Sequence, residues 1–168
     1  MKILKQWWNQ IIKRPVHVPV WAFIGTLLFS AIGFADALYL TIVHYKNELP
    51  PCTLQGCEKV LTSQYAEILG VPVALIGAIY YGAILVMAVL YMEEKYFMKK
   101  ADDPSWYMTL ALSASHIGFF ATIWFVSIQY FVIDAWCQYC LISALCCVAL
   151  WIIGRVYFLK NNKNTELV

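Results

Sequence analysis

The stretch WCQYCL, residues 136–141, stands where a short polar break in the sequence becomes a long apolar run. It places Cys137 and Cys140 at Cys-x-x-Cys spacing. In a helix this spacing puts both sulfurs on one face, one turn apart, close enough to form a disulfide. If Cys137 lies in the first turn, the unpaired N–H groups and the helix dipole stabilise its thiolate. The stretch is therefore open to three interpretations. It is a reactive dithiol at the end of a membrane helix, an ordinary membrane helix that contains two cysteines, or part of a zinc site.

The composition of the chain is that of an integral membrane protein. Of its 168 residues, 62% are hydrophobic and 13% are charged, which is far from the usage of a soluble protein. The length allows one domain, and no internal repeat divides it. Because the net charge is only +2, the expected partner is a lipid bilayer and not a nucleic acid.

Apolar runs predict four membrane-spanning helices, each long enough to cross a hydrocarbon core of about 30 Å. Before them, apolar and basic residues recur at helical spacing, which is typical of a helix in the membrane interface and not of a signal peptide. We expect an all-α integral membrane protein with one domain. It comprises an interfacial helix at 1–18, a four-helix bundle at 19–158 and a polar tail at 159–168, with spans at 19–45, 73–92, 105–133 and 136–158.

A polar segment that contains Cys52 and Cys57 joins the first two spans. From Cys57 to about Leu69 it predicts a short helix, too polar and too brief to cross the membrane. The sequence Gly-Val-Pro at 70–72 ends this helix, and Pro72 suits the first turn of the next one.

The positive charges orient the four spans. The N-terminal segment, the 93–104 turn and the C-terminal end hold all but two of the twelve Lys and Arg residues. Since Lys and Arg accumulate on the cytoplasmic side, both termini are expected there. The 46–70 segment and the 134–137 turn then share the opposite side, which is oxidising in bacteria and in the endoplasmic reticulum.

Four cysteines therefore face one side of the membrane, in two pairs. This arrangement favours a redox site, while a structural zinc site and structural disulfides remain alternatives. Cys146 and Cys147 lie two turns into the fourth span and are expected to be small packing residues. Cys147 shares a helix face with Cys140, so it is a candidate to line the same cavity.

Three motifs in this order resemble the vitamin K epoxide reductase family, in its bacterial branch. They are CEKVLTS at 57–63, Gly-Val-Pro at 70–72 followed by Gly77, and CQYC at 137–140. The resemblance covers about residues 20–155. It implies a four-helix bundle around a quinone pocket, with the half-helix as an extracytoplasmic cap.

The resemblance also implies a role for each outer cysteine. Cys137 and Cys140 match the active-site pair, with Cys140 facing the quinone. Cys52 and Cys57 match a shuttle pair, in which Cys57 exchanges with Cys137. Thiol–disulfide exchange proceeds through a mixed disulfide, so Cys57 must reach Cys137 physically.

The quinone pocket implied by the resemblance includes Ser63, Val73, Gly77 and Ala144 beside Cys140. Ser63 matches the serine or threonine of the capping half-helix. Animal members carry an Asn and a Tyr at the positions that, counted from Gly77 and Cys140, are Val73 and Ala144 here. Those polar groups hold the vitamin K carbonyls in animals, so epoxide reduction is not expected.

Two ionisable residues fall within the predicted spans, where such residues are functional candidates by default. Asp36 is a candidate to relay protons to a quinone, and the favoured alternative is a side chain hydrogen-bonded to a neighbouring helix. For His116 we expect a packed, hydrogen-bonded histidine.

The expected function is that of a membrane thiol oxidase in the bacterial inner membrane. It would reoxidise a separate extracytoplasmic thioredoxin-fold oxidoreductase, since the chain ends without the fused thioredoxin-like domain of many bacterial members. Ubiquinone or menaquinone would accept the electrons. The alternatives are a vitamin K epoxide or quinone reductase of the endoplasmic-reticulum type, and a non-enzymatic membrane protein with structural disulfides or a four-cysteine zinc site.

Overall fold

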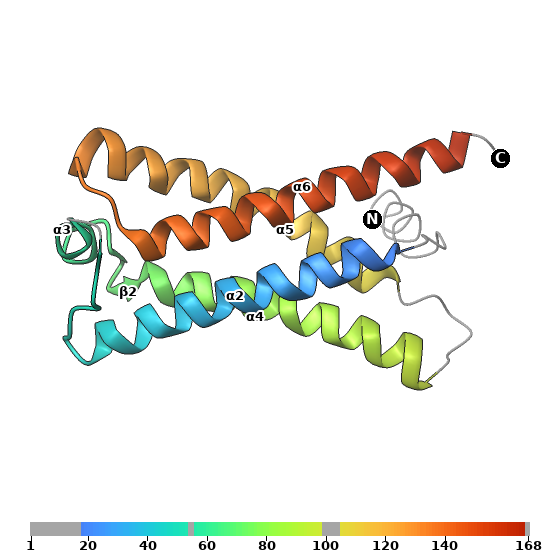
Figure 1. Ribbon diagram of the computed structural model, residues 1–168, viewed down its shortest axis with the longest axis horizontal. Coiled ribbons are helices and arrows are strands. Elements are labelled where there is room, and N and C mark those ends of the chain that lie inside the picture. Colours follow the sequence, from blue (N-terminus) through green and yellow to red (C-terminus); the bar gives the residue numbers. More distant parts are fainter. Residues whose placement is uncertain (1–17, 54–55, 99–104, 167–168) are drawn as a thin grey trace.

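The computed structural model describes residues 18–53, 56–98 and 105–166. Within these ranges, four helices are long and apolar enough to cross a membrane, and they run side by side as a bundle (Figure 1). The predicted all-α membrane bundle is therefore confirmed. The interfacial helix expected at 1–18 lies, except for Val18, outside the described residues. The four helices are α2 (Val20–Tyr45), α4 (Val73–Met92), α5 (Ser105–Ile128) and α6 (Gln138–Glu166).

The outer surface of the bundle is apolar because it faces lipid. Phe120 and Leu145, for example, are each 70% exposed. Lipid is as apolar as these side chains, so the hydrophobic effect does not drive the helices together. Close packing holds them together instead. Gly33 of α2 shows how close: a Cβ atom there would lie 2.6 Å from the ring of Tyr81 on α4.

Buried hydroxyl groups inside the bundle bond to their own helices. Thr26 and Thr41 donate to the backbone carbonyls of Ala22 and Ala37, at 2.8 and 2.7 Å. The membrane core holds no water to bond with these hydroxyls. A hydrogen bond to the carbonyl four residues earlier gives each hydroxyl a partner within its own helix.

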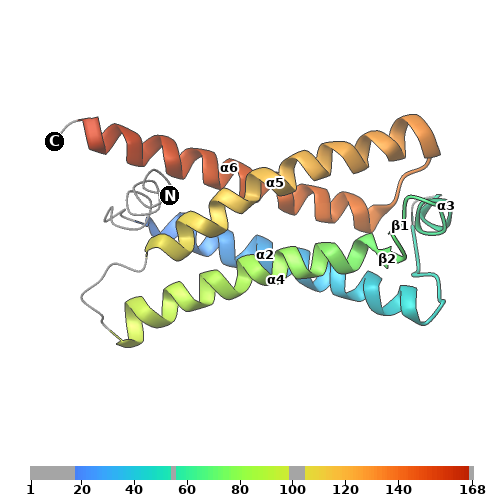
Figure 2. The same ribbon diagram turned by 180° about the vertical axis from the view of Figure 1, so that it is seen from behind.

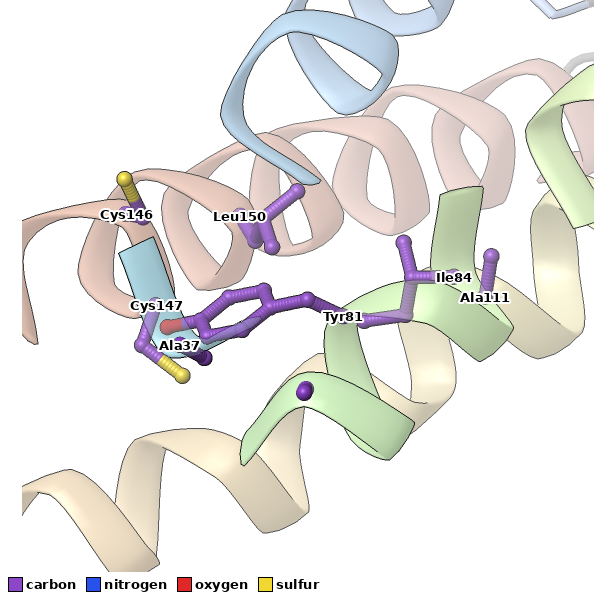
Figure 3. Close-up of a cluster of buried hydrophobic side chains, with 8 residues drawn as sticks. Ala37, Tyr81, Ile84, Ala111, Cys146, Cys147 and Leu150 are labelled. Carbon is purple, nitrogen blue, oxygen red and sulfur yellow. The ribbon is translucent and has the colours of Figure 1, made fainter. Parts of the chain in front are cut away.

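The middle of the bundle is a core to which α2, α4, α5 and α6 all contribute (Figure 3). Cys146 and Cys147 belong to this core and are 4% and 3% exposed. The sulfur of Cys147 donates to the hydroxyl of Tyr80 at 3.8 Å. Both cysteines are thus packing residues, as expected.

A small cap covers one end of the bundle. It contains α3 (Cys57–Leu61) and a hairpin of β1 (Glu67–Ile68) and β2 (Val71–Pro72), whose register pairs Glu67 with Pro72. The short helix predicted to reach Leu69 is therefore wrong in length. Leu69 and Gly70 have φ values of 54° and 79°, which form a turn that no helix can contain. Pro72 precedes α4 and does not lie in its first turn.

The turn between α5 and α6 lies at the same end of the bundle as the cap. Figures 1 and 2 show α3 beside this turn, whereas α2 begins and α6 ends at the opposite end. The last turn of the third span is the π-helix η2 (Gln129–Ile133), closed by Asp134 with φ 50°. A second π-helix, η1 (Glu93–Met98), follows α4. The tail predicted to begin at 159 continues α6 as a helix to Glu166.

Candidate functional site

Cys137 and Cys140 lie at the start of α6. The carbonyl of Cys137 accepts the first helical hydrogen bond, from the N–H of Leu141 at 3.0 Å, so Cys137 is the N-cap residue and α6 begins one residue later. Its own N–H donates to Oε1 of Gln129 at 3.3 Å. Both thiols are free, with Cys137 fully buried and Cys140 partly buried.

The Cys140 thiol changes the acidity of Cys137. It donates a hydrogen bond to Cys137 and so lowers the pKa of that thiol to about 7, although burial opposes the change. Backbone hydrogen bonds at the helix start lower the pKa further, while the charge of Asp36 raises it. Cys137 is therefore the thiol that ionises near neutral pH, as a nucleophile or leaving group in disulfide exchange must.

We expect the alkylation rate of Cys137 in the reduced protein to rise as the pH passes through about 7, because the thiolate is the reactive form. In Cys140→Ala the rise should move to higher pH, since the hydrogen bond is lost while burial remains. Peptide mass spectrometry after timed alkylation measures both profiles. Cys146→Ala is the matched control and should leave the profile unchanged. An unshifted profile in Cys140→Ala would contradict this account.

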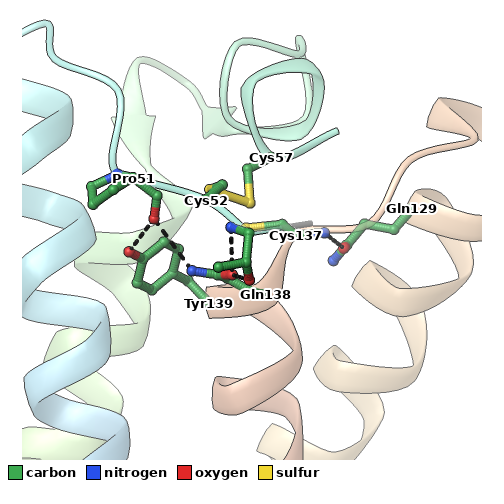
Figure 4. The surroundings of a disulfide bond; sticks show 8 residues. Pro51, Cys52, Cys57, Gln129, Cys137, Gln138 and Tyr139 are labelled. Atoms are coloured by element: carbon green, nitrogen blue, oxygen red, sulfur yellow. Dashed lines mark hydrogen bonds between the residues drawn. A yellow bond between two sulfur atoms is a disulfide. The ribbon is translucent and has the colours of Figure 1, made fainter. Parts of the chain in front are cut away.

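The loop cysteines Cys52 and Cys57 form a disulfide, with Cα atoms 6.3 Å apart. Cys57 begins α3 and is 2% exposed. It belongs to one buried apolar cluster with Cys137, against which Cys52 and Cys140 also pack. Figure 4 shows the disulfide beside Cys137. The structure thus brings the two predicted cysteine pairs together.

Gly56 makes this close approach possible. A Cβ atom at this position would lie 2.9 Å from the Cβ of Ala135 and 3.3 Å from the backbone nitrogen of Trp136. Its φ of 117° is also a value that other residues rarely adopt. The glycine therefore seats α3 directly on the segment that leads to Cys137.

The two residues between Cys137 and Cys140 hold the loop that carries Cys52. Oε1 of Gln138 accepts the N–H of Thr53 at 3.0 Å and also its hydroxyl, while Nε2 donates to the carbonyl of Pro51 at 3.3 Å. The hydroxyl of Tyr139 donates to the same carbonyl at 2.8 Å (Figure 4). We call Gln138 and Tyr139 the loop clamp. The sequence alone does not reveal the loop clamp, because nothing local marks a contact between residues so far apart in the chain.

A cavity of about 300 Å³ lies between the cap and the four helices. Cys140 is part of its wall and Cys137 is not, so the dithiol separates the cavity from the loop disulfide. The positions that the family resemblance assigns to the quinone pocket all line this cavity: Ser63, Val73, Gly77, Cys140 and Ala144.

The cavity wall is mostly apolar, with a few polar side chains that converge on it. Its volume is at the lower end of the roughly 300–1,000 Å³ of small-molecule pockets, which share this character. The residues present therefore fit a planar apolar ring with oxygen atoms at its edge, as a quinone has. Besides Ser63, the polar side chains in the wall are Asp36, His44, Tyr65, Tyr80, Tyr81, Thr122, Gln129 and Ser143.

The remaining candidates lie in different places. Asp36 lines the cavity, and in the described part of the chain its Oδ2 is buried without a hydrogen-bond partner, so the favoured interhelical bond is not made by this atom. Nδ1 of His116 donates a hydrogen bond to the carbonyl of Ser113 at 3.3 Å, and the ring packs against Phe158. Cys147 is not among the residues that line the cavity.

The four outer cysteines do not form a metal site in this structure. Both loop sulfurs are bound to each other. Over residues 18–53, 56–98 and 105–166, no three or more His, Cys, Asp or Glu side chains come together as metal ligands would.

Comparison with known proteins gives one family. The sequence model of the vitamin K epoxide reductase family matches residues 24–154. This match extends from α2 through the cap into α6. No curated protein matches the chain.

Proposed function

Since the chain belongs to the vitamin K epoxide reductase family, and is thus a multi-pass membrane oxidoreductase, we propose that it is a thiol oxidase that passes electrons from an extracytoplasmic protein dithiol to a membrane quinone. One observation carries the proposal. The dithiol at the start of α6 has one thiol, Cys137, packed with the loop disulfide and the other, Cys140, in the wall of an apolar cavity.

The first steps take place on the loop. The dithiol of a separate thioredoxin-fold partner reduces the Cys52–Cys57 disulfide and is itself oxidised. Cys57 then attacks Cys137 of an oxidised Cys137–Cys140 pair, which forms a Cys57–Cys137 mixed disulfide and releases Cys140. Cys52 resolves the mixed disulfide by attacking Cys57, which restores the loop disulfide and releases Cys137.

These steps end with a loop disulfide above a reduced pair, the state of the cysteines in the structure. Cys140 then gives up electrons inside the cavity, and the Cys137–Cys140 disulfide closes again. A bound quinone supplies the acceptor for two electrons and two protons. Val73, Gly77 and Ala144 would hold its ring, with Ser63 at the cap side and Cys140 beside it.

The direction of electron flow follows from redox energetics. A thioredoxin-fold oxidant with a potential of about −120 to −200 mV is not reoxidised by a cytoplasmic glutathione pool, whereas membrane quinones keep the bacterial periplasm oxidising. We therefore place the protein in the bacterial inner membrane, with the cap on the periplasmic side. Ubiquinone or menaquinone is the proposed acceptor.

Electron transfer itself is tested on the four outer cysteines. Full-length protein is reduced with a small dithiol, mixed with a soluble short-chain ubiquinone, and its thiols are tagged by mass at timed intervals. Cys137 and Cys140 should lose their thiols after quinone is added and regain them with fresh dithiol. Disulfides that stay fixed throughout would identify a structural role and refute the proposal.

Membrane orientation is tested with introduced thiols. In a chain whose six cysteines are replaced by alanine, Thr53→Cys and Asp134→Cys should react with an impermeant reagent added outside intact cells. Lys99→Cys, in the turn expected on the cytoplasmic side, is the matched control and should react only after the cells are opened. Labelling of Lys99→Cys from outside would invert the orientation and remove the periplasmic partner.

A further inference from the structure

The cavity has a carboxyl group in its wall. Asp36 lines the cavity together with Ala37, Leu40 and His44, which are spaced so that they share one face of α2. No Lys or Arg is among the described residues that line the cavity. The basic side chain in the wall, His44, lies 3.1 Å from the carboxylate of Glu67.

One oxygen of this carboxyl is left without a partner. Oδ2 of Asp36 is buried and has no hydrogen-bond partner within the described part of the chain. An orphaned buried polar atom costs free energy and calls for an explanation, such as a ligand that binds there.

Three other polar side chains of the wall are already bonded within the protein. The hydroxyl of Tyr81 donates to the carbonyl of Ser143 at 2.7 Å, and the hydroxyl of Ser143 donates to Tyr81 at 3.1 Å. The hydroxyl of Ser63 donates to the carbonyl of Val60 at 2.8 Å. Asp36 is therefore distinguished from these side chains by having an oxygen left for a bound molecule.

The carboxyl is also within electrostatic reach of the dithiol. When it is ionised, Asp36 raises the pKa of Cys137, against the larger lowering by Cys140. Asp36 and Cys140 line the same cavity, so a molecule that takes electrons from Cys140 lies in the same space as the carboxyl.

We infer that Asp36 is a catalytic proton donor for the reduction that takes place in this cavity. This inference rests on the proposed function. When the Cys137–Cys140 disulfide forms, the two thiols release two electrons and two protons. The bound quinone accepts the electrons. Asp36 donates its proton to one oxygen of the quinone and regains one from the Cys140 thiol. The proton of Cys137 leaves to water on the cap side, from which the second quinone oxygen is protonated.

Replacement by asparagine isolates the transferable proton. Asp36→Asn keeps the size of the side chain and can donate a hydrogen bond, but it has no acidic proton to give. Since general acids contribute about 10²–10⁴-fold, reoxidation of the reduced Cys137–Cys140 pair by short-chain ubiquinone should slow by about 10²-fold or more. Asp36→Glu should restore most of the rate. Ser30→Ala removes a buried polar group elsewhere on α2 and should react like the wild type.

Three further measurements separate proton transfer from binding and folding. Equilibrium binding of short-chain ubiquinone should be nearly equal in wild type and Asp36→Asn. Infrared difference spectra should show a carboxylic acid C=O band that shifts when quinone binds to the wild type, and that is missing in Asp36→Asn and kept in Ser30→Ala. Exchange between the loop disulfide and a small dithiol should be unchanged in all variants.

Each outcome bears on one claim. Reoxidation of Asp36→Asn at the wild-type rate would overturn the assignment of Asp36, and so would a slow rate explained wholly by weaker quinone binding. A wild-type protein whose dithiol is not reoxidised by quinone would instead overturn the proposed function and remove the premise of the inference.

Discussion

Cys140→Ala should abolish electron transfer to quinone, whichever reductant supplies the electrons. Among the described residues that line the cavity, Cys140 is the one cysteine, so its loss leaves no thiol in contact with the acceptor. Removing a nucleophile of this kind commonly costs on the order of 10³-fold or more in rate. The rate of quinone absorbance loss with a small dithiol, and then with a reduced thioredoxin-fold protein, measures the effect.

Cys52→Ala is the informative companion to this variant. It should stop turnover with the protein partner, because the loop can no longer form its disulfide, yet leave some turnover with a small dithiol that reaches Cys137 directly. Equal losses with both reductants would mean that the loop pair is not a shuttle. Cys146→Ala, a change in the buried core, should leave both rates near the wild-type values.

The double variant Cys52→Ala plus Cys140→Ala should trap the intermediate. Cys52 and Cys140 are the two thiols that can resolve a Cys57–Cys137 bond from either side, so without them a mild thiol oxidant should convert nearly all molecules to this disulfide. Both partners already lie in one buried cluster. The bond requires Cα atoms within about 7 Å, so in the trapped form the cap must hold Cys57 within this distance of Cys137. Peptide mapping under non-reducing conditions identifies the linked fragments.

The control for the trap is Cys52→Ala plus Cys137→Ala, which leaves Cys140 as the available thiol of the active pair. Since Cys140 belongs to the cavity wall and Cys137 separates it from the loop, no internal bond to Cys57 should form. The trapped form should also resist proteolysis in 46–70, because the cap is tied to α6. Finding Cys57 free, or bonded only between molecules, would refute the relay.

The membrane spans could be predicted from the sequence because the length of the apolar runs and the positions of the prolines determine their limits. The limits expected for the second span coincide with α4, Val73–Met92, and those of the first differ from α2 by one residue. The family was also identified from its motifs and is confirmed by the match to residues 24–154. Charge patterning placed the loop and the last turn at one end, and the fold brings them together there.

The parts that the sequence did not reveal depend on tertiary contacts or on the backbone. The short helix after Cys57 ends at Leu61, and residues 67–72 further along form a hairpin in place of its predicted end. Nothing in this polar sequence with one glycine indicates the hairpin. The π-helical end of the third span and the start of α6 at Gln138 are joined by a hydrogen bond from the N–H of Cys137 to Gln129, a contact across the turn that the local sequence does not indicate. The place of Asp36 within the first span could be predicted from hydropathy, whereas its orphaned oxygen depends on how the helices pack.

The loop clamp has a consequence for how the redox properties of this protein can be tuned. In a Cys-x-x-Cys motif the intervening residues lie beside both sulfurs and so influence thiol acidity and reduction potential. Here Gln138 and Tyr139 also bind the backbone around Cys52. Exchanging this dipeptide therefore changes both a thermodynamic quantity, the potential of the pair, and a kinetic one, the time the loop spends over it. A variant with a more favourable potential can thus turn over more slowly than the original.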